Sequence, residues 1–173
     1  LNAIIPKGTK LNNITIEDDL ITLDFSKELL NIDEELSVKL IESIVYSITE
    51  LDNINKVNIT VDGNPLETYP NTSNKMTLPL TRDIGINKEY TYNSLNNLTK
   101  VIIYYSEEIN DDMYYVPVTK YLNNNDNKDK INIIVEELTT SYIYEDNLKS
   151  ILDENVLLID KEFVDDDLLV LDF

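Results

Sequence analysis

The side chains of this chain that could perform chemistry are carboxylates. There are 33 acidic residues, no His and no Cys, which excludes hydrolase triads with a His base and zinc sites with imidazole or thiolate ligands. A glycosidase requires two Asp or Glu residues that face each other across a cleft. Four carboxylates could be proposed for that role: Glu17, Asp24, Asp62 and Asp172. Each falls in an expected turn or on a polar strand face, so we interpret them as solvated surface groups and predict no catalytic residue.

Calcium is the metal that best suits this composition, because hard cations prefer oxygen ligands. Four side chains occupy positions 1, 3, 5 and 12 of an EF-hand-like count: Asn125, Asn127, Asp129 and Glu136. However, Lys130 stands where such a loop requires Gly. Capping of a following helix by Asp126 or Asn127 explains the same pattern. The three Gly residues are isolated and form no phosphate-binding loop. We therefore predict no metal site and no cofactor.

Tyrosines concentrate in one part of the second half of the chain: Tyr104, Tyr105, Tyr114, Tyr115 and Tyr121. Adjacent side chains of a strand point to opposite faces of the sheet. We therefore expect one set of rings in the core. The other set would form an exposed aromatic patch of the kind that is enriched at protein interfaces.

The net charge restricts the partners. The 33 acidic and 14 basic residues give a formal charge of −19, which repels nucleic acid phosphates and anionic lipid headgroups. We therefore expect no nucleic acid partner. No stretch approaches the roughly 20 apolar residues of a membrane span, and the N-terminal residues have no signal-peptide layout. Membrane attachment is expected only through an anchoring segment upstream of residue 1.

The elements of the first half follow from periodicity. Residues 11–25 alternate on both sides of an acidic turn, which predicts a half-buried β-hairpin. Asn31 and Glu34 have capping-box spacing, and they precede a helix that we expect to end near Leu51. The apolar face of this helix is Val38, Ile41, Val45, Ile48 and Leu51. Residues 57–61 predict a strand before an Asp-Gly turn, residues 66–80 predict irregular backbone or a short edge strand, and residues 81–97 predict a connector.

The second half predicts strands over residues 101–105 and 113–121. Because Pro117 lacks an amide donor, we expect its strand at a sheet edge. An Asn-rich loop then precedes a helix with the apolar face Ile131, Ile134, Val135, Leu138 and Tyr142.

The final segment repeats the first hairpin, because LNNITIEDDLITLDF at 11–25 returns as LIDKEFVDDDLLVLDF at 158–173. We predict an α+β fold of two small two-layer units, with amphipathic helices packed on mostly antiparallel, mixed sheets. The first unit and a joining segment span residues 1–90, and the second unit spans 91–173. A complete unit would contain hairpin, helix, hairpin, helix and strand, of which the first copy holds the last three elements and the second copy the first three. Either terminal segments are missing or the two part-units complete each other; we favour the first explanation.

Several local strings, in their order, resemble a known family. They are Ile5–Leu11, Leu23–Ser26, Ser43–Thr49, Val57–Gly63 and the joining string Pro79–Glu89. In the second unit, Val101–Tyr105, Tyr114–Thr119 and the final Leu-Asp-Phe continue the resemblance. Together they are similar to the GerMN domain family of spore germination and sporulation proteins, in which the domain occurs in tandem. The resemblance covers nearly the whole chain.

The resemblance implies a non-enzymatic envelope protein of low-GC, endospore-forming bacteria. Such a protein would be exported, anchored by lipid on an upstream Cys, and located between the mother cell and forespore membranes. Family members support assembly of the channel complex that links the two cells, and their fold is related to ring-building modules. The implied partners are other sporulation envelope proteins or further copies in a ring. The alternative is a carboxylate-dependent hydrolase acting on cell-wall glycan.

Overall fold

The computed structural model describes residues 3–140, 147–165 and 168–173. The chain divides into two compact units, Leu1–Ile86 and Asn87–Phe173. Among the described residues, no helix is long and apolar enough to cross a membrane. Both units combine helices with mixed or antiparallel sheets, which confirms the predicted α+β class.

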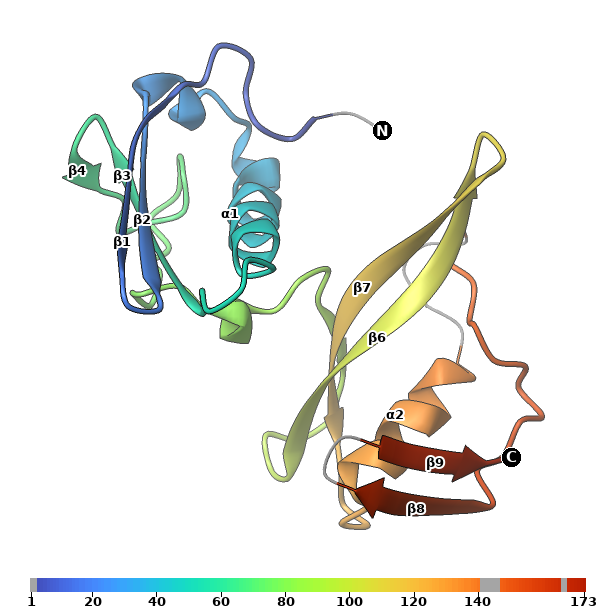
Figure 1. Cartoon of the computed structure of the whole chain (residues 1–173). Coiled ribbons are helices and arrows are strands. Elements are labelled where there is room, and N and C mark those ends of the chain that lie inside the picture. Colours follow the sequence, from blue (N-terminus) through green and yellow to red (C-terminus); the bar gives the residue numbers. More distant parts are fainter. Residues whose placement is uncertain (1–2, 141–146, 166–167) are drawn as a thin grey trace. The chain divides into compact units, whose positions relative to one another are not determined.

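The first unit contains a four-stranded sheet covered on one face by a helix (Figure 1). The strands lie in the order β1 (Leu11–Glu17), β2 (Leu20–Phe25), β3 (Lys56–Val61) and β4 (Asn64–Pro65). β1 and β2 form the predicted antiparallel hairpin, whereas β2 and β3 are parallel. Parallel neighbours require a crossover connection. Here that connection contains the 3₁₀ helix η1 (Lys27–Leu30) and helix α1 (Glu34–Ile48).

The core of the first unit lies between α1 and the sheet. Leu40, Ile41 and Val45 of α1 are fully buried against Ile21 and Leu23 of β2. The N-cap of helix α1 is Asp33 and not Asn31, the cap that the capping-box spacing predicted. Asn31 instead terminates η1 as its C-cap. It ends at Ile48, earlier than predicted, where the Thr49 hydroxyl bonds back to the Val45 carbonyl.

The segment between β4 and residue 81 is largely irregular, as its composition predicted. An isolated bridge between Thr68 and Lys75 closes the segment on itself, and a second bridge, between Leu80 and Val57 of β3, holds it to the sheet. Leu80 is completely buried in the first core. A second 3₁₀ helix, η2 (Arg82–Ile84), follows.

The second unit is built on a three-stranded sheet in the order β5 (Glu89–Thr91), β7 (Asp112–Asn123) and β6 (Leu98–Ile109). β6 and β7 form a long antiparallel hairpin, and β5 pairs with β7 in parallel. Helix α2 (Lys130–Leu138) lies against β6 (Figure 1). Strand β5 was expected to be part of a connector. Its pairing with β7 assigns it to the second unit, so the observed division after Ile86 differs from the expected division after residue 90.

The prediction that Pro117 lies in an edge strand is wrong, because β7 is the central strand of its sheet. The Pro117 carbonyl accepts a hydrogen bond from Asn87 Nδ2, so the backbone polar groups of Pro117 point away from β6. β5 pairs only with residues 120–122 of β7 and does not extend to Pro117. The missing amide donor therefore interrupts no ladder.

The last hairpin is β8 (Asp160–Asp165) and β9 (Leu168–Asp172), paired in antiparallel register as the repeat predicted. In α2, Ile133 and Val135 are the buried residues, and Ile134 and Leu138 pack partly against the core. The expected face included Val135 but not Ile133, and its last member, Tyr142, lies outside the described residues.

Candidate functional site

The structure brings two of the four candidate carboxylates together and separates the others. Asn12 Nδ2 contacts both Asp24 Oδ2, at 3.3 Å, and Asp62 Oδ1, at 3.4 Å. Glu17 lies at the exposed far end of β1, and Asp172 belongs to β9 of the other unit. The four candidate carboxylates therefore do not form a single site.

Asp24 ties β2 to the turn after β3. Its Oδ1 accepts hydrogen bonds from the Thr60 hydroxyl at 2.6 Å and from the Gly63 amide at 2.8 Å. These donors favour the carboxylate and hold its pKa below the ordinary value. A glycosidase acid needs the opposite shift. The geometry gives Asp24 a structural role.

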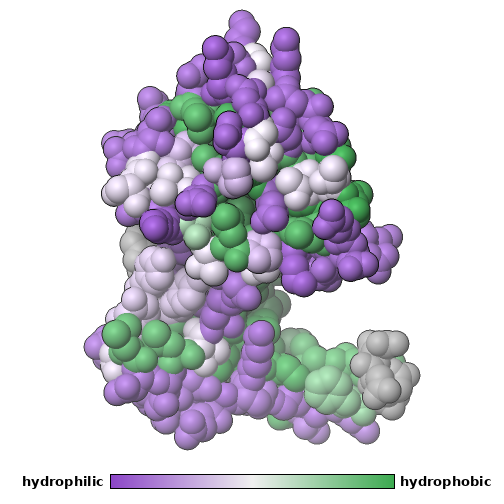
Figure 2. All heavy atoms as spheres, turned by 90° about the vertical axis from the view of Figure 1, so that its left-hand side faces the viewer, coloured by the Kyte–Doolittle hydropathy of each residue, from purple (hydrophilic) through white to green (hydrophobic). Residues whose placement is uncertain are grey.

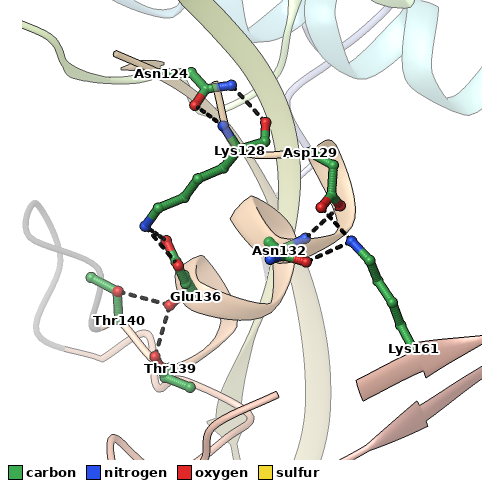
Figure 3. Close-up of polar contacts among 8 residues, drawn as sticks. All are labelled: Asn124, Lys128, Asp129, Asn132, Glu136, Thr139, Thr140 and Lys161. Atoms are coloured by element: carbon green, nitrogen blue, oxygen red, sulfur yellow. Dashed lines mark hydrogen bonds and ion pairs between the residues drawn. The ribbon is translucent and has the colours of Figure 1, made fainter. Parts of the chain in front are cut away.

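The residues of the calcium count are spread over the loop before α2 and the helix itself, with Asp129 at the start of the helix and Glu136 near its end (Figure 3). Asp129 Oδ1 accepts the backbone N–H groups of Ile131 and Asn132, which makes Asp129 the helix N-cap. The predicted caps, Asp126 and Asn127, lie in the preceding loop. The free amides of a first helical turn are capped by the side chain of the residue directly before that turn, and here that residue is Asp129.

Ion pairs engage both carboxylates of the calcium count. Lys128 Nζ lies 2.8 Å from both carboxylate oxygens of Glu136, and Lys161 of β8 pairs with Asp129 (Figure 3). Within the described ranges, no group of three or more Asp or Glu side chains is placed to hold a metal ion.

A buried polar cluster that the sequence analysis missed lies between the sheet and helix of the second unit. Lys120 of β7 is directly opposite Glu89 of β5, and both side chains are 1% exposed. Lys120 Nζ lies 3.4 Å from Glu89 Oε1 and 2.5 Å from Glu137 Oε2 of α2. It also donates to the Tyr105 hydroxyl of β6 at 3.2 Å. One ammonium group therefore links β5, β6, β7 and α2.

Burial controls the protonation of this cluster. Burial raises the pKa of Glu89, and the attraction of the Lys120 ammonium only partly opposes that shift. Burial also raises the pKa of Tyr105. For Lys120, burial acts to lower the pKa, but its hydrogen bond and charge attraction with Glu137 outweigh burial and raise it. Lys120 therefore remains a cation, whereas ionised Glu89 is disfavoured.

One sequence signal could have revealed the cluster. Residues 116, 118, 120 and 122 of β7 share the face that packs against α2, and Val118 on that face is completely buried. Lys120 therefore occupies a position on the buried face of β7, where the alternation predicts an apolar residue. A Lys in that phase requires a buried anion as its partner, although the pattern does not identify which one.

The opposite face of this sheet carries an aromatic surface, which we define as Tyr90, Tyr104, Met113, Tyr115 and Tyr121. Tyr105 is completely buried on the helix side, whereas Tyr104 is 46% and Tyr115 66% exposed. Tyr90 and Tyr121 are opposite each other in the β5–β7 pairing, and their rings stack with centroids 5.1 Å apart. This separation into a core set and an exposed set is the one that strand alternation predicts.

Comparisons with known proteins agree with this architecture. Residues 1–67 match the family model described as "Germane: Sporulation and spore germination". The chain is 31% identical over 172 residues to the spore germination protein GerM of Bacillus subtilis (strain 168), which covers 99% of this chain and 47% of that protein. The solved tandem GerMN domains of the sporulation protein GerM from Bacillus subtilis match with a TM-score of 0.88 and 30% identity, over 98% of this chain and 60% of that one. The chain is therefore similar in both sequence and fold to the tandem GerMN domains of GerM. It spans about half the length of the curated GerM protein that it matches.

Proposed function

We propose that this chain is a non-enzymatic protein-interaction module of the spore-forming cell envelope, which acts in sporulation and spore germination. The similarity to GerM over nearly the whole chain supports the biological setting. The observation that carries the mechanism is the aromatic surface, since exposed Tyr and Met side chains are enriched at the centres of protein interfaces.

The proposed location is extracytoplasmic, in the space between the mother cell and the forespore. Attachment to the membrane would occur through lipid on a segment upstream of residue 1. The proposed partners are other sporulation envelope proteins or further copies of the chain in a ring, and the proposed role is to support assembly of the channel between the two cells. The acidic surface supports protein partners over nucleic acid. In Figure 2, hydrophilic residues dominate the face in view, and hydrophobic residues form separate patches.

The structure offers little support for the alternative, a glycan hydrolase. Asp24 is held in its ionised form by three donors. In the buried cluster, Glu89 and Glu137 are not opposed across an open cleft, because the Lys120 ammonium contacts both. A retaining or inverting pair needs space for a sugar between its two carboxyl groups. The interaction function is therefore the better account.

The proposal is tested by replacing both Tyr104 and Tyr115 with Ser. We expect capture of envelope proteins from sporulating cells to fall by at least about tenfold, because anchor residues carry most of the binding free energy of an interface. The matched control is Leu157→Ser, since Leu157 is an exposed apolar residue of the same unit, at 74%, outside the aromatic surface. Undiminished capture by the double variant would contradict the proposal.

A further inference from the structure

A polar cavity of about 450 Å³ lies beside the buried cluster of the second unit. Its walls come from β5, the end of β7, the loop after β7, and α2. This volume lies within the range of about 300 to 1,000 Å³ that is usual for small-molecule sites. Glu89, Lys120 and Glu137 line it together with the amide-rich residues of the loop.

One acceptor in this cavity is unsatisfied. Glu89 Oε2 is buried and has no hydrogen-bond partner among the described residues. Lys120 does not supply the missing donor, because an ammonium has three N–H groups. Three acceptors already surround it, namely Glu89 Oε1, Glu137 Oε2 and the Tyr105 hydroxyl. A buried carboxylate oxygen without a donor is costly, so a group that brings N–H donors would be stabilised there.

The charge of the residues that line the cavity determines the sign of the charge that a ligand would carry. The lining contains four carboxylates, on Glu89, Asp126, Glu136 and Glu137, and two ammonium groups, on Lys120 and Lys128. The balance is therefore −2 when Glu89 is ionised and −1 when it is neutral, within a chain of formal charge −19. Such a field attracts cations. A bare metal ion fits poorly, because the Lys120 ammonium occupies the space between the two deepest carboxylates.

We propose that this cavity binds a protonated amine, whose N–H group donates to Glu89 Oε2. The amine belongs either to a small free molecule or to a Lys side chain presented by a partner protein. The two sources share one chemistry, and separate measurements distinguish them. The proposal does not depend on the aromatic surface.

The first measurement titrates the whole chain with n-butylamine and, as a neutral probe of equal size, with butan-1-ol. We expect saturable calorimetric binding of the amine and no binding of the alcohol, because the site selects charge as well as donors. Equal affinity for the two probes, or no saturable amine binding at millimolar concentration, would overturn the proposal.

The second measurement uses variants. Glu89→Gln keeps the shape of the side chain but cannot ionise when the ammonium group binds beside it, so we expect amine affinity to fall by at least about tenfold. Asp126→Asn, at an exposed position of the rim, should cause a smaller loss of amine affinity. Because Asp126 is exposed, this variant still tests the proposal if Glu89→Gln folds poorly. The matched control, Glu154→Gln, changes an exposed carboxylate outside the lining and should leave affinity unchanged. Unchanged affinity in both site variants would contradict the assignment.

The third measurement compares n-butylamine with a short peptide that contains one Lys and with the same peptide acetylated on that side chain. Tighter binding of the unmodified peptide identifies a partner side chain as the source. Equal or weaker binding of the peptide identifies a free amine. Binding of the acetylated peptide as tight as that of the unmodified one would overturn the proposal, because acetylation removes the charge.

Discussion

At the scale of single residues, the environment of Glu89 decides its behaviour. Two carboxyl groups, from Glu89 and Glu137, share the ammonium of Lys120, and Glu137 holds the shorter contact. Glu89 is also the more deeply buried of the two, at 1% against 20% exposed. The neutral form of Glu89 is therefore favoured in the fold, whereas the ionised form is favoured in the solvated unfolded chain.

This asymmetry predicts a dependence of stability on pH. Because burial raises the pKa of Glu89 in the folded state, its favourable contribution is complete below the unfolded value of about 4.3 and is lost as the pH rises through the folded value. We expect Glu89→Gln, which mimics the neutral acid, to become progressively more stable than the parent chain as the pH rises from about 4 to 8. Urea unfolding across this range measures the difference.

The control for this prediction is Glu154→Gln, which removes an exposed carboxylate. Its unfolding free energy should follow that of the parent chain at each pH. A constant difference between Glu89→Gln and the parent chain, independent of pH, would show that the side chain does not titrate between the two states.

At the scale of elements, the two related hairpins differ in what surrounds them. In β2 the alternate residues Ile21 and Leu23 are buried, because α1 covers them and β3 pairs beside them. In β9 the corresponding alternation is also present, but its residues are only half buried or exposed. The same local pattern therefore produces the same hairpin, while burial depends on neighbouring elements.

The start of α2 gives a prediction at this scale. Asp129 caps two backbone amides of the helix and also pairs with Lys161 of β8, so it joins α2 to the last hairpin. We expect Asp129→Ala to accelerate amide hydrogen exchange at Ile131 and Asn132, because the helix N–H groups lose their acceptor. Exchange measured by NMR checks this expectation, with Asp126→Ala as a control that removes a neighbouring carboxylate outside the cap.

The same cap should weaken in acid. The hydrogen bond from Lys161, followed by the backbone amide of Asn132, lowers the pKa of Asp129 in the fold. A depressed folded pKa means that the stabilisation is present at neutral pH and is lost as the pH falls through that value. In the parent chain, protection of these two amides should therefore decrease on acidification. Protection that is already low at neutral pH would contradict the capping role.

At the scale of the whole molecule, each unit has a hydrophobic cluster of its own. The first is formed around Leu29, Leu40, Ile41 and Val45 with the sheet of the first unit. The second contains Val101, Ile103, Tyr105, Val118, Ile133 and Leu148. Separate cores allow the two units to unfold as separate cooperative blocks.

Independence of the units can be tested with a core variant. Leu40 is 0% exposed, and we expect Leu40→Ala to destabilise the first unit by about 2 to 5 kcal/mol through loss of apolar contacts and creation of a cavity. The second unit should keep its stability, which residue-resolved hydrogen exchange measures. Leu36→Ala is the matched control, since Leu36 lies on the same helix but is 42% exposed. Equal destabilisation of both units would show that they unfold together.

The sequence alone determined those features that depend on local periodicity. Alternation over 11–25 and 158–173 identified both hairpins, and the apolar positions of Val38, Ile41, Val45 and Ile48 identified α1. Alternation also separated Tyr105 from Tyr104 and Tyr115. These predictions succeeded because a hairpin and an amphipathic helix are specified by residues close together in the chain.

Only the tertiary structure decided which distant residues meet. β5 is three residues long, too short to show a period, and its pairing places Glu89 beside Lys120. The central position of β7, the unsatisfied oxygen of Glu89 and the cavity beside it all follow from that pairing. Strand register and helix packing select contacts between residues far apart in the chain, and the free energy of those contacts depends on burial that no local pattern contains.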